Sequence, residues 1–389
     1  MSVTQITDDN IDTGIDASKL AGSVLPAMDG SALTGINVGT SLLKNGFNPA
    51  VDTNPADGVG AIWINTVTGQ MFSCTDATTD QNTWTNMGSG TGHVTYTPPP
   101  WLFQGRTHGY IIGNAWGINI IQRFSYSSTT SGEDIGDINY GDTAAPMASN
   151  GYTHAHFGGG VVNSWAYAYP NISKFAWGSS VTCSNVGSLT HTRYQGSSHS
   201  SEAYGFYAAG DTMPDPNQSK VDKVSHTSDG NSTDIGDVNA GASVRYGTSS
   251  TTHGYSYRTN YYKEIDTFSF ASSNFQSTVA GYMYNDRDGS ATASSLTHGY
   301  SAGGHENAVG RQRYIDKFSF ASHGTASNIG DIAYDGSSIS GSSSETHGYS
   351  HGGYSGYKTI TRWNYSNDSD IAYYGDLVHN SLEATGTQN

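Results

Sequence analysis

The chain has 389 residues, of which 13% are charged, and 17 Lys and Arg stand against 33 Asp and Glu for a net charge of −16. This balance excludes nucleic-acid binding, which needs a basic surface, and it opposes contact with anionic membranes. Gly (49 residues) and Tyr (26 residues) are abundant, which excludes a disordered chain and favours many short strands joined by tight turns.

The sequence has no apolar run long enough to span a bilayer. Its first residues lack the basic and apolar segments of a signal peptide. We therefore expect no membrane insertion and no secretion signal. Cys74 and Cys183 lie in different regions, so we expect two free thiols rather than a disulfide scaffold.

Residues 1–55 are small, polar and sparsely apolar, without a sustained helical or strand period. A segment this thin cannot bury a core alone, so we expect an extended segment that either stays loose or is ordered against other chains. I-D-A-S-K-L-A-G (15–22) and L-P-A-M-D-G-S-A-L-T-G-I (25–36) resemble the N-terminal segments of bacteriophage tail-fibre and related virion proteins. The resemblance is confined to these low-complexity stretches, and it implies attachment to other virion proteins and trimerisation.

Residues 56–89 alternate apolar and polar side chains in three stretches separated by turn residues. The pattern predicts a small three-stranded β-meander with Trp63, Phe72 and Trp84 on one face, most simply as core. This unit is similar to small modules of phage tail proteins. Residues 90–100 (G-T-G-H-V-T-Y-T-P-P-P) are a linker that is flexible at first and then stiffened by its prolines. We place the domain boundary there.

Residues 101–389 contain a repeat. T-H-G-Y occurs at 107–110, 252–255, 297–300 and 346–349, with degraded copies at 154–157 and 204–206. The anchor positions 108, 154, 204, 253, 298 and 347 are separated by 46, 50, 49, 45 and 49 residues. A period of this length in six copies is typical of a radial or solenoid β architecture.

Each repeat contains a small-residue run, the H-G-Y segment, an alternating aromatic stretch such as D-K-F-S-F (316–320), and D-I-G-D or a relative. Four short strands per repeat predict a propeller blade. The predicted fold is therefore all-β, a six-bladed propeller preceded by the extended segment and the small β module. Small residues would line its axis, and aromatic residues would fill the seams between blades. We expect residues 376–387 to supply a strand to the first blade.

The repeat resembles the kelch motif, which has an Arg, a small run, an aromatic, a Gly pair and a strand ending in an aromatic. Arg193, Arg245 and Arg287 stand in three copies, and Gly pairs occur at 158–159, 303–304 and 352–353. The Gly pair is absent from repeats one, three and four, and Phe, Tyr or His mostly replaces the late Trp. The resemblance covers residues 101–389. It implies a kelch-like propeller fold and no particular activity.

Two repeated features have a chemical and a structural interpretation. The first is the set of anchor histidines, His108, His154, His253, His298 and His347. They could converge on a metal, but packing and a hydrogen bond to the adjacent blade explain them more simply, because Tyr204 replaces one copy. The second is the acids of D-I-G-D, which resemble a hydrolytic pair but are the expected turn residues. D-R-D-G (286–289) has Thr297 where a calcium loop needs Glu. We expect no enzyme activity, no cofactor and no metal.

The loop between H-G-Y and the aromatic stretch differs between repeats, and blade geometry places all six loops on one face. Aromatic residues on variable loops over a rigid scaffold are typical of a binding face. The alternative is that they pack on each other or on neighbouring subunits. The candidate binding residues are Trp116, Trp165, Tyr167, Tyr169, Tyr261, Tyr262, Tyr354 and Tyr357.

Together these features predict a phage virion structural protein, a tail fibre or spike whose propeller is a receptor-binding head for host attachment. Expected partners are other virion proteins, two further copies in a homotrimer, and a host surface glycan or protein. The expected location is the exterior of the virion, after assembly in the host cytoplasm. The alternatives are a decoration or tail-attached protein without receptor contact, and a glycan-cleaving propeller enzyme.

Overall fold

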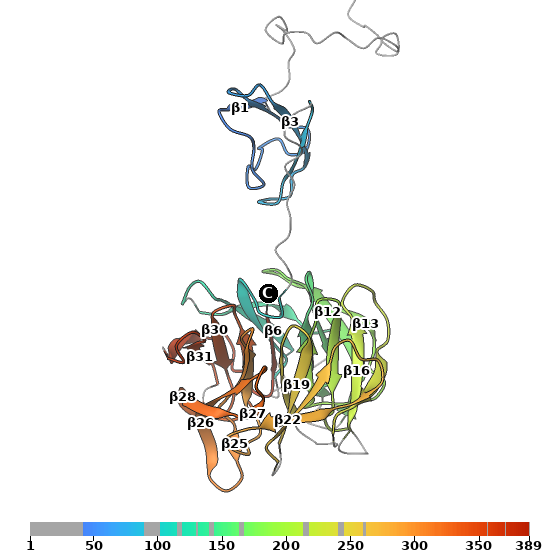
Figure 1. Ribbon diagram of the computed structural model, residues 1–389, viewed down its shortest axis with the longest axis vertical. Coiled ribbons are helices and arrows are strands. Elements are labelled where there is room, and N and C mark those ends of the chain that lie inside the picture. The colour runs from blue at the N-terminus through green and yellow to red at the C-terminus, as the bar shows by residue number, and fades with distance from the viewer. Residues whose placement is uncertain are drawn as a thin grey trace, which may run out of the picture. The chain divides into compact units, whose positions relative to one another are not determined.

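A computed structural model describes residues 42–88, 102–114, 119–129, 131–139, 144–162, 167–212, 218–239, 245–259, 262–355, 357–369 and 371–388. The chain divides into two compact units, Met1–Pro99 and Pro100–Asn389. The described residues of both units form strands, turns and bends without any helix, so the fold is all-β (Figure 1). Among them no helix is long and apolar enough to cross a bilayer.

The first unit contains a four-stranded sheet in the order β1 (Leu42–Asn45), β2 (Ile62–Asn65), β3 (Met71–Asp76) and β4 (Thr83–Asn86). β2, β3 and β4 form the expected antiparallel meander, and β1 extends it by pairing with β2 in parallel. The prediction of three strands was therefore one strand short. β1 falls within the part expected to be extended, where L-L-K-N is too short to show a strand period.

Trp63, Phe72 and Trp84 are buried on one face of this sheet, together with Ala61 and Cys74. The indole rings of Trp63 and Trp84 meet edge to face at 6.1 Å. The alternation of apolar and polar residues in the sequence thus corresponds to side chains that point alternately into the core and outward, as expected for a sheet with one buried face.

The second unit contains six larger sheets within its described residues. We number them by their H-G-Y segment. The first sheet has the order β33 (Thr385–Gln388), β5 (His108–Ile112), β6 (Ile120–Ser125) and β7 (Glu133–Asp137). The second comprises β8 (Met147–Asn150), β9 (His154–Gly158), β12 (Asn171–Ala176) and β13 (Ser184–Ser188). The third comprises β14 (Ser197–Ser200), β15 (Tyr204–Ala208), β16 (Lys220–Ser225) and β17 (Thr233–Asp237).

The fourth sheet comprises β18 (Arg245–Ser249), β19 (His253–Arg258), β20 (Glu264–Ser269) and β22 (Thr278–Tyr282). The fifth comprises β23 (Ala291–Ser294), β24 (His298–Ala302), β26 (Gly310–Ser319) and β28 (Ser327–Gly336). The sixth comprises β29 (Ser340–Ser343), β30 (His347–His351), β31 (Thr359–Asn364) and β32 (Ala372–Asp376). Short strands β21 (Phe275–Gln276) and β27 (Gly324–Thr325) add to the third and fourth sheets, β25 (His305–Glu306) pairs with β26, and β10 (Val161–Val162) pairs with β11 (Tyr167–Ala168).

The four pieces of each repeat form the four successive strands of a sheet, from the small-residue run to the D-I-G-D segment. The first sheet takes its small-residue strand from the other end of the chain, because β33 pairs with β5 through Thr385 and Ile112 and through Gln388 and Gly109. This pairing confirms that the C-terminal residues supply a strand to the first sheet.

We call β33, β8, β14, β18, β23 and β29 the inner strands. Each inner strand contacts two others. The contacts run from β8 through β14, β18, β23 and β29 to β33, and β33 in turn contacts β8. Backbone N–H groups link them, each donating to a side-chain oxygen of the next sheet at 2.8–3.3 Å. The linked residues are Asn150, Ser200, Ser249, Ser294, Ser343 and Gln388. Because equivalent residues meet, the inner strands run in the same direction.

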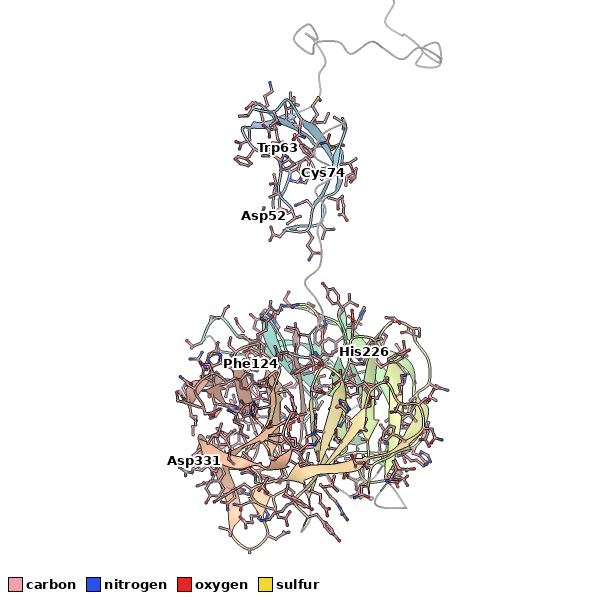
Figure 2. All side chains as sticks on the ribbon, viewed as in Figure 1. Asp52, Trp63, Cys74, Phe124, His226 and Asp331 are labelled. Carbon is pink, nitrogen blue, oxygen red and sulfur yellow. The ribbon has the colours of Figure 1, made fainter. Side chains whose placement is uncertain are left out.

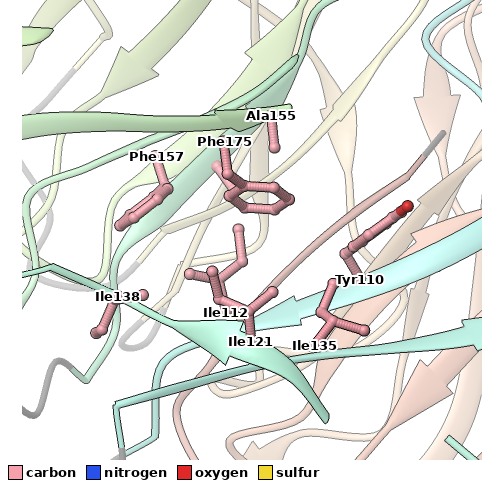
Figure 3. Packing of buried hydrophobic residues seen from close by; sticks show 9 residues of the cluster. Tyr110, Ile112, Ile121, Ile135, Ile138, Ala155, Phe157 and Phe175 are labelled. Carbon is pink, nitrogen blue, oxygen red and sulfur yellow. The ribbon is translucent and has the colours of Figure 1, made fainter. Parts of the chain in front are cut away.

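Aromatic pairs fill the seams between neighbouring sheets. A ring on the second strand of one sheet packs at 4.5–5.0 Å on a ring at or just beyond the end of the third strand of the next. The pairs are Tyr110–Trp177, His156–His226, Phe206–Phe270, Tyr255–Phe320, Tyr300–Tyr365 and Tyr349–Tyr126. Figure 3 shows the seam of the first and second sheets, where Tyr110 and Ile112 face Phe157 and Phe175.

Glycine in H-G-Y is required by the approach of the third strand. A Cβ atom at Gly348 would lie 2.3 Å from the indole of Trp363, and one at Gly109 would lie 2.6 Å from the ring of Phe124. These contacts are far shorter than van der Waals distance. The repeated glycine is therefore a packing residue.

Two of the three kelch-like arginines make buried ion pairs. Arg193 bonds Asp222 at 3.1 Å and Arg287 bonds Asp316 at 3.0 Å, with all four side chains inaccessible to solvent or nearly so. Arg245 does not share this position, because it lies within β18 and pairs in the ladder with Arg258. The expectation that it is a third copy of the same Arg was wrong.

Candidate binding face

The loops between the second and third strands all lie at one end of the sheets, because the inner strands share one direction and the second strands run antiparallel to them. We call this end the loop face. The residues where the chain enters the second unit lie at the opposite end. There Phe103 O accepts hydrogen bonds from the side-chain amides of Asn150 and Gln388, and Gly105 N donates to Ser343 O.

Five of the predicted binding residues lie within the described chain. Tyr167, Tyr262 and Tyr357 are exposed, whereas Tyr169 and Tyr354 are half-buried. Trp116, Trp165 and Tyr261 lie outside the described residues. The five described residues come from loops of the second, fourth and sixth sheets, so they are distributed over the loop face.

The best-formed cluster on the loop face belongs to the fourth sheet. The guanidinium of Arg258 lies 3.4 Å from the ring centroid of Tyr262 and donates to Glu264 Oε2 at 2.7 Å. Lys263 Nζ donates to the backbone oxygen of Tyr284 at 3.1 Å. The guanidinium holds the ring in one position before any ligand binds. Little further side-chain freedom would therefore be lost when a ligand packs on the ring.

Two further tyrosines complete this cluster. Tyr282 pairs with Glu264 across β20 and β22, and Tyr282 and Tyr284 are each 49% exposed, close to the 46% of Tyr262. We call Tyr262, Tyr282 and Tyr284 the tyrosine patch. Sequence reasoning missed Tyr282 and Tyr284 because they lie at the end of the fourth strand and just beyond it, outside the loop between H-G-Y and the aromatic stretch. The signal was G-Y-M-Y-N (281–285), in which Met283 is buried between two outward tyrosines.

The sixth sheet presents a second cation–aromatic contact on the loop face. Arg311, on β26 of the fifth sheet, lies with its guanidinium 4.8 Å from the ring centroid of Tyr354 and donates to Ser355 Oγ at 3.4 Å. The loops of neighbouring sheets therefore contact each other here, and this contact holds the half-buried ring of Tyr354 in place.

The anchor histidines do not converge. Each begins a second strand, and four of them bond through Nδ1 to the preceding threonine hydroxyl at 2.7–2.9 Å. Burial lowers the pKa of His108, His154, His253 and His298. The expected hydrogen bond to the adjacent sheet is therefore a local one, made because the tight turn places the threonine beside the imidazole. Among the described residues no three His, Cys, Asp or Glu side chains could hold a metal ion.

The D-I-G-D acids also have a structural role. Asp134 and Asp234 accept hydrogen bonds from the N–H groups of Gly136 and Gly236, at bulges in the fourth strands rather than in turns. A Cβ at Gly236 would lie 2.2 Å from the backbone oxygen of Phe275. The motif therefore bends the fourth strand of the sheet, so that the backbone of another segment, here at Phe275, can approach it closely.

No family model and no curated protein matches this chain. The candidate binding face therefore rests on the geometry of these residues alone.

Proposed function

We propose that residues 101–389 form a six-bladed β-propeller. Two independent cycles support it, the contacts of the inner strands and the aromatic seam pairs. The N–H to side-chain oxygen links add an open series of five, from the second sheet round to the first. The last seam carries most weight. Tyr349 of the sixth sheet stacks on Tyr126, which follows the third strand of the first sheet, at 4.7 Å. A solenoid would leave its first and last sheets apart.

We further propose that the protein is a structural component of a phage virion and that this propeller is its receptor-binding head. The observation that carries this proposal is the tyrosine patch. It exposes three tyrosines beside Arg258, Lys263 and Glu264, on the face opposite the point where the chain enters the unit. Rigid, exposed aromatic residues among charged groups are enriched at binding hot spots and suit a surface glycan or protein.

The N-terminal part would supply assembly. The stretches at residues 15–36 resemble attachment segments of tail fibres, and they lie outside the described residues. We propose that they join the protein to other virion proteins and to two further copies, giving a homotrimer on the exterior of the particle. Light scattering of the full chain beside a chain starting at Pro98 tests this part separately.

Host binding separates the proposed head from a decoration protein. The full-length protein is applied to an array of bacterial surface polysaccharides and to whole cells of a strain panel. We expect retention on some of them, and we expect Tyr262→Ala, Tyr282→Ala and Tyr284→Ala to weaken it by about tenfold or more each. Tyr152→Ala is the matched control, because Tyr152 is 44% exposed but lies in a turn at the opposite end.

Equal binding by the patch variants and the control would contradict the proposed face, and absence of binding to every surface would favour a decoration role. Release of reducing ends from a bound polysaccharide, abolished by substitution of one acidic residue, would instead favour the glycan-cleaving alternative.

A further inference from the structure

The second unit holds a polar cavity of about 120 Å³ between the inner strands of all six sheets. Main chain and small side chains such as Ser198, Thr292 and Ser340 line it. Phe103 lies at one end and Glu383 at the other. At the Phe103 end the side-chain amides of Asn150 and Gln388 donate hydrogen bonds to Phe103 O. The Glu383 end belongs to the loop face, and we call it the mouth.

The size of the cavity limits its ligand. A cavity needs only about 10–15 Å³ of such volume to hold one water molecule, so this cavity has room for several. Pockets for drug-sized ligands are several times larger, about 300 Å³ or more. An ion or a molecule of a few heavy atoms therefore fits this cavity.

Glu383 departs from the repeat at the mouth. The equivalent positions of other sheets hold Ala145, Gln195, Gly289 and Ser338, and like them Glu383 has a positive φ, of 51°. Its backbone continues a hydrogen-bonded rim, with Glu383 N donating to Ser338 O and Ala145 N donating to Glu383 O. Among the described residues, Glu383 is thus the ionisable side chain at a rim position that otherwise holds a small or neutral residue.

The carboxyl group of Glu383 is poorly compensated. Ser338 Oγ donates to Oε1 over a long 3.4 Å, and Oε2 is buried with no hydrogen-bond partner among the described residues. None of the ion pairs among the described residues includes Glu383. Burial, with repulsion from Asp288, raises the pKa of Glu383 to about 7. A positive charge placed in the mouth would offset both the burial of the Glu383 carboxylate and its repulsion from Asp288.

We propose that this cavity binds a small primary ammonium ion whose charge pairs with Glu383. An ammonium group needs one counter-charge, and its three N–H donors suit a lining of hydroxyl and carbonyl oxygens. Hard metal ions in proteins commonly take several carboxylates, and the described residues contain no group of three such ligands. The inference does not depend on receptor binding, since the cavity lies between the inner strands.

Calorimetric titration of the full chain with ethylammonium chloride tests the proposal. We expect saturable binding at pH 8 that weakens about tenfold at pH 6, because Glu383 is then mostly protonated. Glu383→Gln keeps the shape and removes the charge, so binding should be lost. Glu202→Gln, at an exposed glutamate in a turn at the opposite end, is the matched control and should bind normally.

Ethanol and sodium chloride are titrated in parallel, and neither should give a saturable signal. Thermal unfolding checks that Glu383→Gln is folded. If it is not, Ser198→Val, which narrows the cavity and leaves Glu383 in place, should weaken binding instead. Unchanged binding in both variants, an equal signal from sodium chloride, or no ethylammonium binding by the native chain would each overturn the proposal.

Discussion

The seam between the second and third sheets should make the protein sensitive to acid. At the other five seams the closest ring pair consists of Tyr, Phe or Trp, but here it consists of His156 and His226, stacked 5.0 Å apart (His226 is labelled in Figure 2). His226 Nε2 bonds Ser149 Oγ at 3.1 Å. His156 is 2% exposed. His226 is half-buried. The pKa of each ring is lowered, so both are neutral in the folded chain near neutral pH.

Burial lowers the pKa of His156 to about 3, with further contributions from His226, His154 and Lys174 and an opposing one from Asp229. It lowers the pKa of His226 to about 4. In the unfolded chain both titrate near 6.5, so the unfolded state binds more protons below that pH and stability is lost as pH falls. Between pH 6.5 and pH 5 the pair should cost about 3 kcal/mol in unfolding free energy.

The double substitution His156→Phe and His226→Phe isolates this effect, because phenylalanine occupies both equivalent positions of the Phe206–Phe270 seam. Urea unfolding of the native chain and the variant is measured from pH 7 to pH 4.5. We expect the native chain to lose about 3 kcal/mol more than the variant between pH 6.5 and pH 5. The comparison cancels other groups, such as Glu383, whose raised pKa acts in the opposite direction. Parallel pH profiles would refute the reasoning.

Two further substitutions test the packing. Asp316→Asn leaves the buried guanidinium of Arg287 without its counter-ion and should cost about 3–5 kcal/mol in urea unfolding; a neutral outcome would show that Arg287 finds another partner. Gly348→Ala drives a methyl group against Trp363 and should cost about 1–3 kcal/mol. Gly178→Ala, whose Cβ would meet nothing closer than 3.7 Å, is its control, and equal melting temperatures for these two would contradict the packing account.

The repeat made much of the strand pattern predictable. A period in the high forties marks six units, and within each unit the small run, H-G-Y, the aromatic stretch and D-I-G-D become successive strands. The aromatic seams were predictable too, since alternating rings on a strand must face both neighbours. His156 and His226 show the limit of such prediction. They occupy the seam positions where other repeats have Tyr, Phe or Trp, but unlike those residues they titrate.

Other features depend on contacts that a single sequence does not display. β1 needs β2 as its partner, and its four residues carry no period of their own. The kelch-like Arg position was assigned by spacing, but Arg245 pairs within its ladder whereas Arg193 meets the buried Asp222. Tyr282 and Tyr284 gain their place beside Tyr262 only through the pairing of β22 with β20. The unpartnered oxygen of Glu383 likewise depends on strands brought together from the whole repeat.

Removal of β33 is the most direct test of the proposed closed ring of six sheets. A chain ending at Ala384 keeps the other inner strands but loses the pairing of β33 with β5 and the link of Ser343 to Gln388. The account predicts a thermal midpoint lower by about 10 °C or more, since the loss of four paired residues and a buried Thr387 should cost several kcal/mol. An unchanged midpoint, measured by calorimetry beside the full chain, would contradict closure of the ring.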